Sequence, residues 1–363
     1  MKGMKLDPWG SSDFTDYKKL IKEFGIKPFR PLLEKINDPD KLMRREIIYG
    51  HRDYERIIEA MKNKKEFCLI TGFMPSGKPH LGHKMVMEEI IWHQKKGAKI
   101  YVCIADIEAY TVRKMSRELC DSFGKEYLAY LIALGLKADK NTRLYFQSKN
   151  KNPEYHAFSK FASRKTTFNE MKDIYGELTP GKIVSSLTQV ADILLPQIEN
   201  GPMPTVVPVG SDQDPHIRFT RDIASRFSSE FPFILPSSTY HMFQRGLDGG
   251  KMSSSRENSY ISLDESEESL KRKIMNAVTG GRETLQEQKE KGGIPEKCMI
   301  FELFKYHLIE NDEKLNKIYS ECKSGSRICG ECKKQCFELM LSFLKKLNEK
   351  KEKCMSKIEK MMD

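Results

Sequence analysis

The sequence lacks any run of eighteen apolar residues, so no segment has the length and hydropathy of a membrane-spanning helix. Its first ten residues, MKGMKLDPWG, contain neither the apolar core of a secretion signal nor an Arg-rich amphipathic transit pattern. Internal repeats and long low-complexity tracts are also missing. Together these absences predict a folded, cytoplasmic protein that does not bind membranes.

The composition allows ordinary buried cores and a polyanionic partner. The chain has 363 residues, of which 39% are hydrophobic, and this is enough for two folded domains. The formal net charge of +11 favours a partner such as a nucleic acid, because Lys and Arg neutralise phosphates and release counterions. Many Lys-rich proteins bind no nucleic acid, so the motifs have to decide between the two possibilities.

Apolar runs and helical spacing alternate in the first half of the chain. The stretches FCLITG (67–72) and KIYVCIAD (99–106) predict two buried parallel strands, and HLGHKMVMEEIIWHQKKG between them has helical spacing. A third strand is predicted in PTVVPVG (204–210). Strand, helix and strand form a βαβ unit. We therefore predict an α/β fold, in which a Rossmann-like parallel sheet domain is followed by a C-terminal α-helical domain.

This pattern divides the chain into three parts. Residues 1–65 are expected to form an N-terminal extension packed on the core. Residues 66–262 would form the Rossmann-like domain, with a mostly helical insertion at about 119–200. Residues 263–363 are helical in pattern and end in a Lys-rich tract, which is more often a solvated helix face than a binding surface.

The first motif, MPSGKPHLGHK (74–84), lies directly after a predicted strand and directly before a predicted helix. His80 and His83 are three residues apart, at a helix start where backbone N–H groups and the helix dipole favour an anion such as a phosphate. Gly82 leaves room for a flat base against the backbone. The overlapping string GFMPSGK (72–78) has Walker A spacing, but Pro79 stands where that motif needs Ser or Thr to hold magnesium. No GxGxxG string is present either, so the P-loop and the dinucleotide motif are both excluded.

The second motif, LDGGKMSSSRENS (247–259), places Lys251 after two glycines and before three serines. Such a segment predicts a mobile loop with many phosphate donors. By itself it would more often be a flexible linker. As a pair, however, HLGH and KMSSS resemble the HIGH and KMSKS signatures of class I aminoacyl-tRNA synthetases, with Leu81 in place of the usual Ile.

The resemblance extends over nearly the whole chain. The strings DPWGSSDFTDYKKLIKEFG, RREIIYGHRDYERII, GKIVSSLTQ, VGSDQDPHIRFTRDIASR and TGGRETLQEQKEKGG resemble archaeal and eukaryotic-type tryptophanyl-tRNA synthetases, in order and with compatible spacing. Tyrosyl-tRNA synthetases share the first two motifs, whereas the GSDQDPH and TGGRET strings and the long N-terminal extension are similar to the tryptophan branch. The resemblance implies an enzyme that uses ATP and Mg²⁺ to activate L-tryptophan and transfers it to tRNA(Trp), working as a homodimer. The alternatives are a tyrosyl-tRNA synthetase, a small-molecule nucleotidyltransferase of the same fold, and a metal-containing RNA-binding protein without activity.

The resemblance also implies roles for particular residues. Glu108 and Gln189 match residues that contact the substrate ammonium group, and Gln213 matches one near its carboxylate. Ile70 and Cys103 align where many eukaryotic-type members have Tyr and Gln, and neither can make the same hydrogen bond to the indole nitrogen. The residue that recognises this nitrogen is therefore not identified from the sequence. The implied catalytic residues are His80, His83 and Lys251. The implied ATP-binding residues are Ser76, Gly77, His80, Gly82, His83, Gly210, Asp212, Lys251, Met252, Ser253 and Ser254. The implied tryptophan-binding residues are Ile70, Gly72, Cys103, Glu108, Gln189 and Gln213.

Cysteines gather near the C-terminal end of the chain. Cys322, Cys329 and Cys332 have the spacing C-x6-C-x2-C, and Cys298 precedes them. Four thiolates suit tetrahedral zinc or a four-iron cluster. The spacing resembles that of the [4Fe-4S] site of some bacterial tryptophanyl-tRNA synthetases. We expect these four cysteines to hold a [4Fe-4S] cluster that stabilises the helical domain, with zinc as the alternative ion. Cys336 could replace one ligand, and reduced cysteines without a metal are the remaining alternative.

Overall fold

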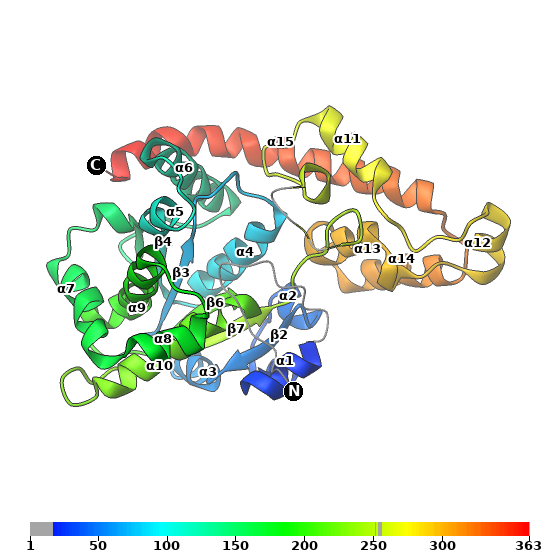
Figure 1. Ribbon diagram of the computed structural model, residues 1–363. Coiled ribbons are helices and arrows are strands. Elements are labelled where there is room, and N and C mark those ends of the chain that lie inside the picture. The colour runs from blue at the N-terminus through cyan, green and yellow to red at the C-terminus, as the bar shows by residue number, and fades with distance from the viewer. Residues whose placement is uncertain (1–16, 251, 253–255, 363) are drawn as a thin grey trace. The chain divides into compact units, whose positions relative to one another are not determined.

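The computed structural model describes residues 17–250, 252 and 256–362 (Figure 1). The chain forms two compact units. The described part of the first unit comprises residues 17–76, 86–242 and 355–362, and the second unit comprises residues 77–85 with the described residues of 243–354. The predicted first motif thus begins at the end of one unit and continues in the other.

The first unit contains a seven-stranded sheet with the order β1-β2-β7-β6-β3-β4-β5. The five strands from β7 to β5 are parallel to one another, whereas β2 pairs antiparallel with both β7 and β1 at one edge. The strands are β1 (Lys27–Pro28), β2 (Ile48–Arg52), β3 (Cys68–Phe73), β4 (Lys99–Ile104), β5 (Thr142–Phe146), β6 (Thr205–Gly210) and β7 (Ser237–His241). From β3 the chain continues outwards to β4 and β5, and then returns to β6 on the other side of β3. The order reverses between β3 and β6, and ligands of open α/β sheets bind at the carboxyl ends of the strands at such a point.

The predicted α/β, Rossmann-like class is confirmed, and the three predicted strands are β3, β4 and β6. Four strands, β1, β2, β5 and β7, were not predicted, and the reasons are clear for two of them. β5 lies inside the segment that was expected to be mostly helical, because TRLYF is short and only its last two residues are buried. β2 lies in the expected N-terminal extension. It was not predicted because its sequence, IYGHR, contains glycine, histidine and arginine, although four of its five residues are buried.

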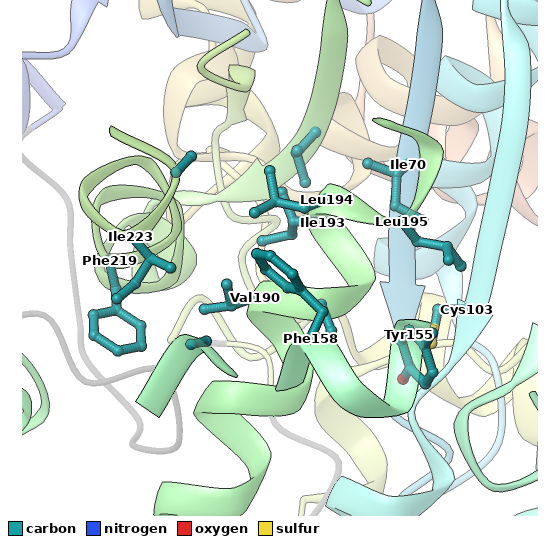
Figure 2. Close-up of a cluster of buried hydrophobic side chains, with 14 of the residues drawn as sticks. Ile70, Cys103, Tyr155, Phe158, Val190, Ile193, Leu194, Leu195, Phe219 and Ile223 are labelled. Carbon is teal, nitrogen blue, oxygen red and sulfur yellow. The ribbon is translucent and has the colours of Figure 1, made fainter. Parts of the chain in front are cut away.

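Helices cover both faces of the sheet. On one face, buried side chains of β3, β4 and β5 pack against α7 (Pro153–Phe161), α9 (Pro180–Asn200) and α10 (Asp214–Arg226). Figure 2 shows part of this cluster, with Ile70 of β3 and Cys103 of β4 among its members. On the other face lies α6 (Arg117–Leu134), where a Cβ atom on Gly124 would come within 2.5 Å of the Phe146 ring. Glycine is therefore needed where this helix approaches the sheet. The remaining α-helices of this unit are α1 (Tyr17–Phe24), α2 (Lys41–Arg44), α3 (Glu55–Lys62), most of α4 (Leu81–Lys95), α5 (Asp106–Thr111) and α8 (Phe168–Tyr175).

The second unit is helical after the second motif, as predicted for the C-terminal region. Its helices are α11 (Glu267–Asn276), α12 (Leu285–Lys291), α13 (Met299–Leu303), a π-helical turn (Phe304–Leu308), α14 (Asp312–Lys323) and most of α15 (Cys329–Met362). The side chains of Ser266, Thr284 and Asn311 accept backbone N–H groups at the starts of α11, α12 and α14. No helix in the described ranges is long and apolar enough to cross a membrane.

Candidate functional site

The HLGH segment is bound to the chain that follows the second motif. His80 forms an isolated antiparallel bridge with Ser262. The N–H of Leu81 donates to the carbonyl of Ile261 over 3.1 Å, and the N–H of Leu263 donates to the carbonyl of Pro79 over 2.9 Å. These backbone bonds hold the two motifs of the sequence in one compact unit, although about 170 residues separate them in the chain.

The two histidines cap the start of α4 (Leu81–Lys95), and His80 stands just before the helix rather than in its first turn. The N–H of Gly82 donates to Nδ1 of His80 over 3.1 Å, and the N–H of His80 donates to Nδ1 of His83 over 3.2 Å. The two ring centroids are 3.8 Å apart. An imidazole whose Nδ1 accepts a hydrogen bond keeps its proton on Nε2, so each ring presents one N–H donor.

Burial keeps both rings neutral. It lowers the pKa of His80 to about 4, and it lowers the pKa of His83 well below its ordinary value, with the proximity of His80 acting in the same direction. At neutral pH the pair therefore offers hydrogen-bond donors and no positive charge. The positive charge for a polyphosphate has to come from elsewhere.

Gly82 allows a close approach between the two motifs. A Cβ atom on this residue would lie 2.8 Å from the terminal methyl group of Met252 and 2.9 Å from the His80 ring. Met252 is the described residue of the KMSSS string; Lys251, Ser253 and Ser254 lie outside the described residues. A side chain at Gly82 would therefore displace the histidine, the methionine or both.

The described residues on either side of the KMSSS string are bonded to one another. The N–H of Leu247 donates to the carbonyl of Ser259 over 3.0 Å, and Arg256 forms an ion pair with Asp248 at 2.6 Å. Gly249 has a φ of +82°, a conformation that L side chains rarely adopt. These contacts tie together the two described ends of the segment that contains the second motif.

The residues expected to bind tryptophan and the ATP ribose lie in the first unit, on or after the parallel strands. Ile70 and Cys103 are both 1% exposed and point to the same face of the sheet. Glu108 lies on α5, directly after β4. The others are Gly72 on β3, Gln189 on α9, Gly210 at the end of β6, Asp212 and Gln213 in the 3₁₀ turn that follows β6, and Ser76 after β3.

Asp192 on α9 is a buried carboxylate that the sequence analysis did not single out. Its Oδ1 accepts hydrogen bonds from the hydroxyls of Tyr155 (2.8 Å) and Tyr145 (2.9 Å) and from the thiol of Cys103 (3.4 Å). Its Oδ2 accepts one from the amide of Gln147 (2.7 Å). Burial raises the pKa of Asp192, and these donors oppose the rise. The only signal in the sequence is one carboxylate within the apolar run VADILLP.

Two amide oxygens near Asp192 are buried without partners. The Oε1 atoms of Gln147 and Gln189 have no hydrogen-bond partner in the described part of the chain. Gln189 lies three residues before Asp192 and therefore on the same side of α9. An unpaired buried acceptor costs roughly 1–3 kcal/mol. An N–H donor supplied by a ligand would satisfy such an oxygen.

The four predicted metal ligands line one cavity in the second unit. Cys298, Cys322, Cys329 and Cys332 all border it. Burial and the three neighbouring cysteines raise the pKa of Cys322 to about 11. The folded chain thus brings cysteines from three separate segments to one cavity.

Two glycines make room for these sulfur atoms. A Cβ atom on Gly281 would lie 2.7 Å from Sγ of Cys329, and one on Gly293 would lie 2.7 Å from Sγ of Cys322. The side chains are not drawn together into a ligand group: no three His, Cys, Asp or Glu residues of the described ranges are arranged to hold a metal ion. The four thiols fit a thiolate-bound centre by their chemistry and shared cavity, and Cys336, which is buried, does not line the cavity.

The fold and the paired nucleotide motifs define a class of enzyme. A family model described as tRNA synthetases class I (W and Y) matches residues 61–345, and the chain belongs to this family. The relatives lie in its tryptophan branch. The tryptophan–tRNA ligase of Hyperthermus butylicus is 50% identical, with 99% of this chain and 98% of the relative covered, and that of Methanocaldococcus jannaschii is 49% identical, with 97% and 96% covered. The crystal structure of tryptophanyl-tRNA synthetase from Aeropyrum pernix superposes with a TM-score of 0.92 at 44% identity, over 99% of both chains.

Proposed function

We infer that the chain is a tryptophan–tRNA ligase. It activates L-tryptophan with ATP to tryptophanyl-adenylate and pyrophosphate, and transfers the tryptophan to tRNA(Trp). The observation that supports this most strongly is identity near one half, over the full length, to ligases of this specificity. Membership of a usually dimeric family supports a homodimer, and the reaction itself supports a cytoplasmic location, where tRNA is used.

The first reaction step is an in-line attack of the tryptophan carboxylate on the α-phosphorus of ATP. No covalent enzyme intermediate is required, so the protein acts by positioning and by stabilising charge. His80 and His83 are assigned as neutral N–H donors to the phosphates, consistent with their low pKa values. Lys251 is assigned to the leaving pyrophosphate, and Mg²⁺ supplies further neutralisation when it is bound.

The other assignments keep the family roles. Glu108 and Gln189 are proposed to bind the ammonium group of tryptophan, and Gln213 its carboxylate. Gln189 has a buried amide oxygen that suits an ammonium donor. Ser76, Gly77, Gly82, Gly210 and Asp212, together with Met252, Ser253 and Ser254, are proposed to bind ATP. We also retain the division into an extension, a catalytic domain and a helical anticodon-binding domain as a proposal.

We assign recognition of the indole nitrogen to Asp192. Ile70 offers no acceptor at all, and Cys103 already donates its thiol hydrogen to this carboxylate. Oδ2 of Asp192 accepts one bond in the described structure, from Gln147, and a carboxylate oxygen has room for a second. The phenylalanine side chain has no donor to offer, so a buried acceptor at this place favours tryptophan.

The test of this assignment compares two variants of the same hydrogen-bond network. Asp192→Asn replaces the carboxylate, whereas Tyr155→Phe removes one bond to it and leaves the acceptor in place. We expect Asp192→Asn to lower kcat/KM for tryptophan about 10- to 150-fold and to reduce the preference over phenylalanine, because a charged hydrogen bond contributes about 1.5–3 kcal/mol. Tyr155→Phe should lower stability without changing that preference. If both variants prefer tryptophan over phenylalanine as strongly as the wild type does, Asp192 has a structural role only.

The reaction itself is tested by amino-acid-dependent ATP–pyrophosphate exchange on protein purified without oxygen. Tryptophan, tyrosine and phenylalanine are supplied separately. Exchange with tryptophan alone is expected. Exchange driven by tyrosine would place the chain in the sister branch, and no exchange with any of the three would favour an RNA-binding protein without activity.

We propose that Cys298, Cys322, Cys329 and Cys332 hold a [4Fe-4S] cluster, with zinc as the alternative. Support comes from the shared cavity and from the glycines that accommodate two of the sulfur atoms. Such a centre would join the segment before α13 to α14 and α15, and thereby stabilise the helical unit. Iron, acid-labile sulfide and zinc analysis of anaerobically purified protein, with absorption near 400 nm, tests the assignment. Protein without any of these elements would contradict it.

A further inference from the structure

One charged side chain lines the cysteine cavity among the described residues that border it. Arg327 lies between Cys322 and Cys329 in the sequence, and its Nε donates a hydrogen bond to Sγ of Cys332 over 2.9 Å. Much of the rest of the lining is apolar, formed by Phe301, Phe304, Ile318 and Ile328. A positive charge directed at one sulfur atom from within such surroundings is costly unless it has a partner.

The guanidinium group is held from two helices. Nη1 of Arg327 donates to the carboxylate of Glu321 on α14 over 3.1 Å, and Nη2 donates to the side-chain oxygen of Gln335 on α15. The arginine side chain is 17% exposed. Because its plane is fixed on both outer nitrogens, the Nε–H points at Cys332 without further loss of conformational freedom.

The contact between Arg327 and Cys332 would have an electrostatic effect on a bound metal centre. Four thiolates around Zn²⁺ or around a [4Fe-4S]²⁺ core carry a net charge of about −2. In an apolar cavity that charge needs compensation, and hydrogen bonds from charged donors are roughly twice as strong as neutral ones. Partners of this kind orient metal ligands, and their loss typically costs 10–100-fold in metal affinity.

We propose that Arg327 is a positioning residue of the metal centre: it orients Cys332 and offsets the negative charge of the four thiolates. It thereby slows the loss of the metal and, in an iron–sulfur centre, raises the reduction potential. This inference rests on the metal centre proposed above. The competing view is that Arg327 only joins α14 to α15 through Glu321 and Gln335.

The experiment compares three variants of the full-length protein, each purified without oxygen and analysed for iron, sulfide and zinc. Arg327→Gln removes the charge and the Nε–H donor. Arg327→Lys retains the charge but loses the planar group. Glu321→Gln is the matched control: it removes the ion pair with Arg327, but glutamine keeps a side-chain oxygen that can accept the Nη1–H, so the guanidinium stays oriented and its bond to Cys332 is retained. Metal release is followed after addition of EDTA, by absorption or with a zinc-sensitive dye, and the reduction potential is measured if iron is present.

We expect Arg327→Gln to release the metal at least tenfold faster than the wild type, with Arg327→Lys between the two. Glu321→Gln should release it at nearly the wild-type rate. For an iron–sulfur centre, the potential should fall in Arg327→Gln and stay unchanged in Glu321→Gln.

Two outcomes would overturn the role of Arg327 alone: wild-type release in Arg327→Gln, or equally fast release in Arg327→Gln and Glu321→Gln. Wild-type protein without bound iron or zinc would instead overturn the metal centre itself, and this inference with it. Metal analysis of the wild type therefore distinguishes the two failures.

Discussion

Replacing Gly82 by alanine should slow tryptophan activation without unfolding the protein. The added Cβ would lie 2.9 Å from the His80 ring and 2.8 Å from the methyl group of Met252. Carbon atoms normally approach to about 3.5–4.0 Å, so the neighbours have to move by roughly 0.6–1 Å. Met252 can rotate its flexible end away. His80 is less free, because its Nδ1 accepts the N–H of Gly82 itself.

The size of the effect follows from this displacement. A misplacement of about 1 Å in a positioned group costs on the order of 10²-fold in rate. We therefore expect activation by Gly82→Ala to be about 10–100-fold slower, equivalent to roughly 1.4–2.7 kcal/mol in the barrier. The free energy of unfolding should rise slightly or stay unchanged, since alanine is about 1 kcal/mol more favourable than glycine in a helix.

The assay is ATP–pyrophosphate exchange at saturating tryptophan, with thermal unfolding measured on the same samples. Gly330→Ala serves as the control, because it adds the same methyl group in the first turn of α15, where a Cβ meets no atom within 4 Å. The control should match the wild type in exchange. Exchange by Gly82→Ala at the wild-type rate would refute the packing argument, and a large loss of thermal stability would show that the effect is one of folding.

Three further perturbations test other parts of the molecule. Lys251→Ala, at a position outside the described residues, should lower the rate of adenylate formation far more than equilibrium binding of tryptophan, and equal losses would contradict its role at the pyrophosphate. Burial lowers the pKa of His216 to about 3. In the unfolded chain the pKa of histidine is near 6.5, so the contribution of the neutral ring to stability is complete above about pH 6.5. It falls as the pH drops towards 3, by at most about 1.4 kcal/mol per pH unit. Urea unfolding of His216→Gln should therefore depend less steeply on pH between 6.5 and 4.5 than that of the wild type, and an unchanged slope would argue against this assignment. Gly124→Ala places a methyl group 2.5 Å from the Phe146 ring and should lower the free energy of unfolding by about 1–3 kcal/mol in the same urea assay. If this variant is as stable as the wild type, the packing argument at Gly124 is wrong.

Local patterns were sufficient where a property depends on neighbours in the chain. The apolar runs of β3, β4 and β6 are continuous because strands of a parallel sheet are buried on both faces, and the sequence predicted all three. The HLGH and KMSSS strings are short segments whose backbone and side-chain chemistry is local, and they identified the nucleotide and the family. β5, in contrast, escaped prediction because TRLYF is buried only at its end and lies between helical segments.

The cysteine spacing shows the limit of such patterns. It predicted four sulfur atoms in one place, and the four residues line one cavity. It said nothing of Arg327, which in the sequence is one basic residue among many. Only the packing of α14 beside α15 directs its Nε at Cys332, because Glu321 and Gln335 fix the guanidinium from both helices.

The sequence by itself determined the fold class, the family and the two nucleotide motifs, because each depends on the order and spacing of residues in short segments. The tertiary structure decided the surroundings of Asp192. Asp192 is one carboxylate in an apolar helix until β4, β5 and α7 bring Cys103, Tyr145 and Tyr155 to it. A buried acceptor needs hydrogen-bond donors, and here the donors are distant in the chain. Only folding brings them within hydrogen-bonding distance of the carboxylate.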